Sequence, residues 1–69
     1  MRQFKKFVEF AKSNGFRWAM STNFNDDIVT IRLWRDSWDN WVEGNKSIEK
    51  VSTSAIEMMN RYLEWVGGE

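Results

Sequence analysis

The sequence of 69 residues contains no cysteine, no histidine and no proline. Without cysteine the chain has no disulfide, and without cysteine or histidine it lacks the ligands that zinc and copper prefer in proteins. The same absences remove the most common nucleophiles and general bases of enzymes. No P-loop, GxGxxG or GxSxG motif occurs. We therefore predict a protein that is not an enzyme and that uses no cofactor and no metal.

Carboxylates are the remaining candidates for a metal site. Asp26 and Asp27 are adjacent, and Asp36 lies three residues before Asp39, so either pair could in principle hold Mg²⁺ or Ca²⁺. Neither pair has the spacing or the glycine of an EF-hand loop. Aspartate is also common in turns, where its side chain hydrogen-bonds to the local backbone. We therefore interpret these residues as turn formers.

Long apolar runs are absent as well. No segment approaches the ~18 apolar residues of a membrane-spanning helix, and residues 1–6 do not form the apolar stretch of a signal peptide. A cytoplasmic location is the default expectation. The net charge is zero, although residues 1–20 carry five basic side chains and one acidic side chain. We interpret that basic excess as a solvated helix face, because typical nucleic-acid-binding proteins are far more basic overall.

Aromatic residues are abundant: the chain has five Trp, five Phe and one Tyr. A chain of this length supports one domain, residues 1–69, and such a domain buries only ~60% of the surface that its unfolded chain exposes. Small domains compensate with disulfides, a metal, a partner or a dense core. The composition favours a dense aromatic core, because each buried aromatic side chain removes a large area from water.

The spacing of apolar residues changes along the chain. Residues 4–11 have apolar side chains at i, i+3, i+4 and i+7, and Gly15 follows as a helix stop, so residues 2–14 are predicted to form a helix. In residues 16–21, large apolar residues alternate with polar or small ones. Residues 28–34 are rich in β-branched and aromatic residues. Both segments are predicted to be strands.

Residues 36–44 allow two interpretations. In the first, residues 36–40 form the turn of a hairpin, and the return strand runs through residues 41–43. In the second, the segment is one short helix with Asp36 as N-cap and Gly44 as its stop. We favour the hairpin, because a two-stranded sheet is rarely stable alone.

Helical spacing returns from Ile48 to Val66. Asn45 or Ser47 can cap the start of this helix. Ser54 is a second possible start, because it opens an S-x-x-E capping box. Gly67 and Gly68 end the helix.

The resulting fold class is α+β with the order α-β-β-β-α. Two amphipathic helices and one three-stranded antiparallel sheet bury their apolar sides most simply in two layers. Both helices then lie on the same sheet face. That face is predicted to carry Phe16, Trp18, Met20, Val29, Ile31 and Leu33.

The opposite sheet face is the candidate binding surface. Alternation places the following residues on it: Arg17, Ala19, Ser21, Thr30, Arg32 and Trp34. Tryptophan and arginine are among the residues most enriched in binding hot spots. We predict a protein partner that contacts Trp34, Arg32, Arg17, Trp38 and Trp41. Two alternatives remain open: Trp34 packs along the stems of Arg32 and Arg17 as a second cluster without function, or this face is buried in a homodimer.

The element order and the length are similar to those of the double-stranded-RNA-binding domain. In that family the second helix begins with lysines that grip phosphates. Residues 44–50 here supply only Lys46 and Lys50, with Glu49 between them. A single strand could instead stack on Trp34 beside Arg32 and Arg17. Nucleic-acid binding is therefore the alternative function.

Two segments carry a further resemblance. Residues 4–16, FKKFVEFAKSNGF, and residues 28–34, IVTIRLW, look like parts of small accessory proteins encoded by bacteriophages and prophages of Gram-positive bacteria. The resemblance implies a non-enzymatic protein that acts by occupying a host or phage partner, as phage-encoded inhibitors of CRISPR nucleases do.

Overall fold

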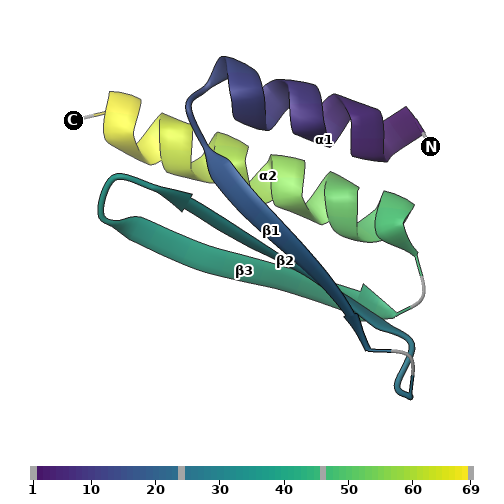
Figure 1. Cartoon of the computed structure of the whole chain (residues 1–69). Helices are drawn as coiled ribbons and strands as arrows, with labels where there is room; N and C mark the ends of the chain where they lie inside the picture. Colours follow the sequence, from purple (N-terminus) through teal and green to yellow (C-terminus); the bar gives the residue numbers. More distant parts are fainter. Residues whose placement is uncertain (1, 24, 46, 69) are drawn as a thin grey trace.

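The computed structural model describes residues 2–23, 25–45 and 47–68. Figure 1 shows α1 (Arg2–Ser13), β1 (Arg17–Asn23), β2 (Ile28–Arg35), β3 (Trp38–Asn45) and α2 (Ile48–Gly67). The three strands form one antiparallel sheet in the order β1-β2-β3. The prediction of an α+β fold with the order α-β-β-β-α is confirmed.

Helix α1 ends in a Schellman motif. The Phe16 N–H donates to the Ala11 carbonyl at 2.9 Å, and Gly15 between them has φ 74°. Glycine adopts this left-handed conformation without a steric penalty, because it has no Cβ. The motif reverses the chain direction, so that Phe16 packs in the core near Ala11 and β1 begins immediately afterwards.

Strand β2 supplies the centre of the hydrophobic core. Val29, Ile31 and Leu33 are buried, whereas Arg32 between them is exposed. This period-two pattern is typical of a sheet that is covered on one face only. The complete buried cluster consists of Phe7, Ala11, Phe16, Val29, Ile31, Leu33, Val51, Ala55 and Met59.

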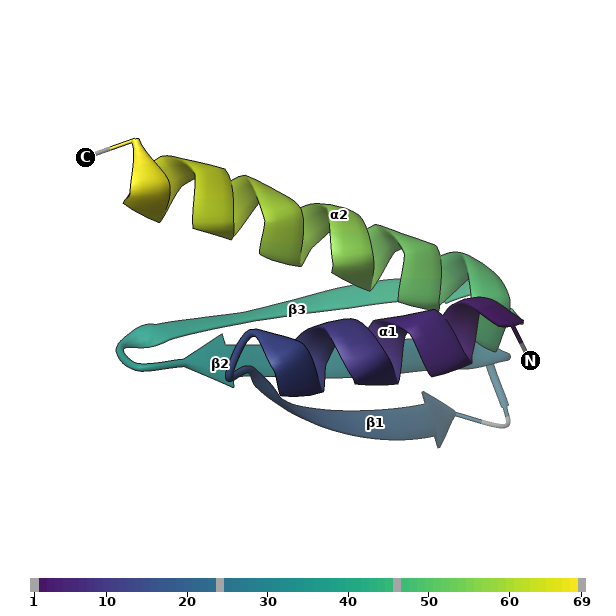
Figure 2. The ribbon, with the colours of Figure 1, turned by 90° about the horizontal axis from the view of Figure 1, so that it is seen from above.

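Ring contacts connect both helices to this sheet face. Trp18 pairs with Leu33 and therefore shares its face. The Trp18 ring lies 5.2 Å from the Phe7 ring of α1. At the opposite edge of the sheet, Trp38 of β3 lies on this same face, and its ring stacks on Tyr62 of α2 at 4.6 Å. The two helices lie beside each other, as the two views in Figures 1 and 2 show.

Polar contacts join the N-terminal turns of the two helices. The backbone N–H of Gln3 donates to Glu49 Oε2 at 2.8 Å, and the Gln3 side-chain amide donates to Thr53 Oγ1 at 3.0 Å. The first N–H groups of a helix have no partner within the helix. Glu49 therefore acts as an N-terminal cap for α1 that is supplied by α2.

Helix α2 begins at the earlier of its two predicted starts. Ser47 is the N-cap, and its hydroxyl accepts a hydrogen bond from the Lys50 N–H at 3.2 Å. The alternative start at Ser54 is wrong, because Ser52 and Thr53 lie within the helix. Their hydroxyls donate to carbonyls one turn earlier, at 2.6 and 3.1 Å, so that the completely buried Ser52 keeps a hydrogen-bond partner.

The hairpin interpretation of residues 36–44 is confirmed, and the short helix is wrong. The loop is shorter than predicted: it consists of Asp36 and Ser37, and β3 begins at Trp38 opposite Arg35. Asp36 has φ 55°. Aspartate tolerates this conformation better than most residues, and loops of two residues with positive φ match the twist of the flanking strands.

Met20 lies on the predicted sheet face, but it does not belong to the buried core. Met20 pairs with Ile31 and so lies on the helix side of the sheet, but 37% of its surface is exposed. Strand β1 is an edge strand, and its ring contacts with α1 are made by Trp18, near the start of the strand. Beyond that point the side chains of β1 are exposed.

Within the described residues, no helix is long and apolar enough to cross a membrane.

Candidate functional site

The sheet face away from the helices forms the candidate site, called here the open face. Strand pairing defines it by four rows of opposed residues across β1, β2 and β3. The rows are Arg17–Trp34–Asp39, Ala19–Arg32–Trp41, Ser21–Thr30–Glu43 and Asn23–Ile28–Asn45. The six residues that the sequence predicted for this face all lie on it, and β3 adds Asp39, Trp41, Glu43 and Asn45.

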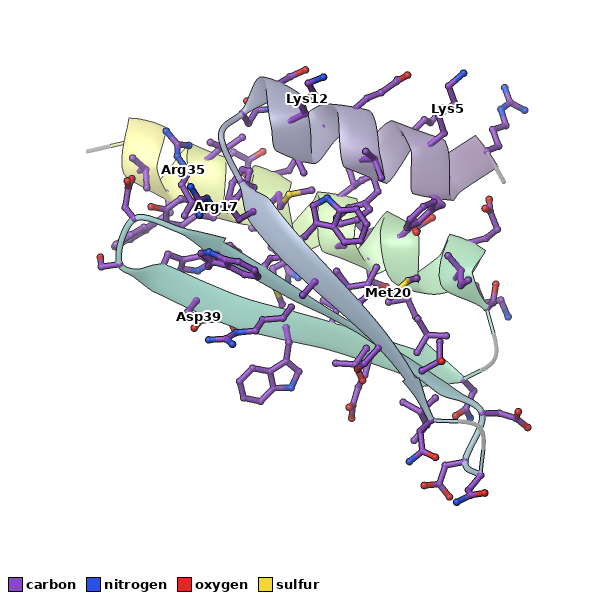
Figure 3. The ribbon with its side chains drawn as sticks, viewed as in Figure 1. Lys5, Lys12, Arg17, Met20, Arg35 and Asp39 are labelled. Carbon is purple, nitrogen blue, oxygen red and sulfur yellow. The ribbon has the colours of Figure 1, made fainter. Side chains whose placement is uncertain are left out.

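Arg32 occupies the centre of the open face. Its Nε donates to Asp39 Oδ1 at 3.0 Å, and its Nη2 donates to Asp39 Oδ2 at 2.5 Å. Its guanidinium carbon lies 5.5 Å from the centroid of the Trp34 ring. This bidentate pair, together with a cation–π contact, restricts the orientation of the guanidinium. Figure 3 labels Asp39 on β3.

Trp41 is the most exposed large apolar side chain of the open face, with 61% of its surface accessible. It stands directly opposite Arg32 on β3, whereas Trp34 is half-buried on β2. Ala19, Ser21 and Thr30 have small side chains, and a shallow hollow forms there beside Trp41. The hollow is lined by Ala19, Met20, Ser21, Thr30, Arg32 and Trp41.

Arg32 also changes the ionisation of its partner. The hydrogen bonds and the positive charge of Arg32 hold the pKa of Asp39 below its ordinary value, against a weaker opposing effect of desolvation. The same hydrogen bonds raise the pKa of Arg32. A lowered carboxyl pKa stabilises the folded state above the unfolded-state pKa of about 3.9, and this stabilisation is lost as the pH falls through the folded-state pKa.

We expect an NMR titration of the Asp39 carboxyl carbon to give a midpoint below that of an ordinary aspartate. Replacing Arg32 with alanine should return the midpoint to the ordinary value, because both causes of the shift are removed. A midpoint that is unchanged in Arg32→Ala would contradict the bidentate pair.

Arg17 lies at the edge of the open face, opposite Trp34. Together with Arg35 it lines a second hollow near the turn after α1, and Figure 3 shows the two side chains there. Arg35 points to the helix side, where its guanidinium carbon is 5.5 Å from the Phe16 ring. Arg17 therefore contributes positive charge at the border of the site rather than at its centre.

Trp38 lies on the other side of the sheet from the open face. Its ring stacks on Tyr62 at 4.6 Å with an interplanar angle of 21°, and it meets Phe16 edge to face at 5.7 Å. From the sequence, Trp38 and Trp41 were both predicted to contact the partner. In the structure they lie on opposite faces of the sheet, because side chains an odd number of residues apart in one strand point to opposite faces.

Sequence reasoning missed the second exposed tryptophan, Trp65, of which 64% is accessible. It lies near the C-terminal end of α2, with its ring 6.2 Å from that of Tyr62. A groove there is lined by Trp38, Asn40, Met58, Arg61, Tyr62 and Trp65. The spacing i, i+3 from Tyr62 to Trp65 is the signal that could have found this pair.

The candidate carboxylate pairs are engaged with neighbouring side chains. Both oxygens of Asp39 bind Arg32, and Asp26 Oδ2 accepts a hydrogen bond from the Asn23 side chain at 3.1 Å. Among the residues that the structure describes, no group of three or more acidic side chains lies close enough together to hold a metal ion.

Comparisons of the chain with known protein families, curated proteins and solved structures gave no match. No family model matches the chain, and no curated protein or solved structure matches it significantly.

Proposed function

We propose that this protein is a non-enzymatic binding module that recognises another protein through its open face. The exposure of Trp41 is the observation that supports this proposal most strongly. An exposed indole ring can contribute strongly to binding, because a partner that covers it removes a large apolar area from water. The resemblance to small phage accessory proteins suggests that the partner is a host or phage protein.

The arrangement around Trp41 adds to the proposal. Arg32 is already held by Asp39 and Trp34, so it loses little side-chain entropy when a partner binds. Tryptophan and arginine dominate interface hot spots. The expected partner surface therefore has an apolar pocket for the Trp41 indole and hydrogen-bond acceptors beside it for Arg32.

We expect Trp41→Ala to weaken partner binding by about 30-fold or more, the effect of losing a hot spot worth about 2 kcal/mol. Immobilised wild-type and variant chains would be incubated with a lysate of the native host, and the retained proteins quantified by mass spectrometry. Trp65→Ala is the matched control, because it also removes an exposed indole but lies on α2. A protein retained by wild type and Trp65→Ala and lost from Trp41→Ala is the expected result. Equal retention by all three chains would rule out Trp41 as a contact.

Single-stranded nucleic acid is the second candidate ligand, and the position of Arg17 opposite Trp34 favours it. A base could stack on the indole while the arginine contacts a phosphate. Asp39 and Glu43 on the same face oppose this binding mode. Fluorescence anisotropy with a labelled oligonucleotide at two salt concentrations distinguishes the candidates, because phosphate binding weakens steeply with added salt.

A further inference from the structure

The outer edge of β1 is a second surface that is available for binding. Strand β1 pairs with β2 on one side and lies at the edge of the sheet. In Figure 2 it forms the lower border of the molecule. Every second residue of such a strand directs its backbone N–H and C=O away from the sheet.

Apart from Arg17 at its start, this edge lacks the features that normally prevent edge-to-edge pairing. Residues 18–23 include no charged residue and no proline, and the pairing of β1 with β2 runs from Arg17 to Asn23 without a bulge. Natural proteins protect edge strands with lysine, proline, bulges or a covering helix. Apart from Trp18, the side chains of β1 are exposed along the strand. We propose that β1 pairs with β1 of a second copy and joins two sheets into one of six strands.

The opposite edge of the sheet is less suited to the same pairing. A two-fold antiparallel contact of β3 centred on Trp41 would place Asp39 opposite Glu43 of the second copy. Like charges directly opposite each other destabilise a strand pair. Helix α2 also lies against β3, through the stack of Trp38 on Tyr62.

The β1 edge is self-complementary in one register. Centred on Met20, the contact pairs all seven residues of the strand. Met20 meets Met20 of the second copy, Ala19 meets Ser21, Trp18 meets Thr22 and Arg17 meets Asn23. No like charges are opposed. The two Met20 side chains, each 37% exposed in the single chain, cover each other on the helix side.

The size of this contact predicts its strength. One strand pair is a small interface, and interfaces below about 1,200 Å² belong to weak or transient complexes. We therefore expect a dimer whose population rises with concentration in the micromolar range. In this dimer the two open faces are continuous and carry two copies of Arg32 and Trp41.

Disulfide cross-linking tests the register, because the chain contains no cysteine of its own. Met20→Cys should form a cross-linked dimer rapidly under mild oxidation. Opposed residues of an antiparallel pair have Cα atoms about 4.5–5.5 Å apart, which is within the range of a disulfide. Thr22→Cys is the matched control: in this register the two copies of residue 22 are four residues apart along the strand, or about 13 Å. We expect it to cross-link slowly. Equal rates for the two variants would overturn the proposed register.

Charge exchange at the same position tests the dimer without a covalent bond. Met20→Lys and Met20→Glu should each sediment as a monomer, whereas their equimolar mixture should recover the dimer, because opposite charges then face each other across the two-fold axis. Asn40→Lys, which adds the same charge on β3, should sediment as wild type does.

A wild-type chain that stays monomeric from about 1 μM to about 1 mM would overturn the proposal, as would a Met20→Lys variant that dimerises as wild type does. If an extended peptide adds to β1 while the chain alone stays monomeric, the proposal fails as well.

Discussion

Replacing Phe7 with alanine is expected to lower the free energy of unfolding by about 3–5 kcal/mol. Phe7 is completely buried, and its ring lies 5.2 Å from that of Trp18. Its removal takes away one of the two ring contacts that connect α1 to β1, the other being that of Phe4 with Trp18, and leaves a cavity between the helix and the sheet. A chain of 69 residues has a total stability of roughly 3–10 kcal/mol, so that much of the variant should be unfolded at 37 °C. Urea denaturation followed by tryptophan fluorescence measures the change.

Two variants serve as controls for Phe7→Ala. Lys5→Ala changes an exposed residue on the same helix and should leave the midpoint of denaturation nearly unchanged. Phe7→Leu keeps most of the apolar volume and should cost clearly less than the alanine substitution. If Phe7→Ala were as stable as Lys5→Ala, α1 would not belong to the hydrophobic core.

The second large effect separates two tryptophans of the same strand. We expect Trp38→Ala to destabilise the fold by about 2–3 kcal/mol, because it removes the stack on Tyr62 and the edge-to-face contact with Phe16. For a domain of this size that corresponds to a fall in Tm of roughly 10–20 °C. Trp41→Ala should change the Tm by only a few degrees, because most of that side chain is already in water.

Thermal denaturation followed by circular dichroism measures both variants. Tyr62→Phe is a useful third chain, since it keeps the aromatic ring and should preserve most of the stacking energy. Similar falls in Tm for Trp38→Ala and Trp41→Ala would mean that Trp41 also packs against the fold. The contact surface proposed for the open face would then lose its main residue.

The parts of the fold that depend on local spacing could be predicted from the sequence. Helix α1 and the two faces of β2 follow from periods of 3.6 and 2, and Gly15 marks the end of α1 because a left-handed residue is needed there. The central location of Arg32 on the open face follows from the same alternation.

The face on which Trp38 lies could not be predicted from spacing alone. It depends on the length of the loop after β2, because a shift of one residue in register moves every side chain of β3 to the other face. The sequence suggested a turn over residues 36–40, and the structure forms the loop from Asp36 and Ser37. The pairing of Arg32 with Asp39 depends on that same register.

The exposure of Met20 required a different kind of information. Alternation assigns Met20 to the helix side correctly, but burial also depends on how far the helix layer extends over the sheet. That extent is set by where the turn at Gly15 directs α1 relative to β1. Short-range patterns carry no signal for it.

The position of α2 at the end of the element order affects how this chain emerges from the ribosome. The strands are complete before the residues that cover them, Val51, Ala55 and Met59, have been synthesised. At about 5–20 residues per second, Met59 follows Asn45, the last residue of β3, by roughly 1–3 s. The apolar face of the sheet therefore cannot be fully covered until α2 has been synthesised, so we expect the core to be completed only at the end of translation.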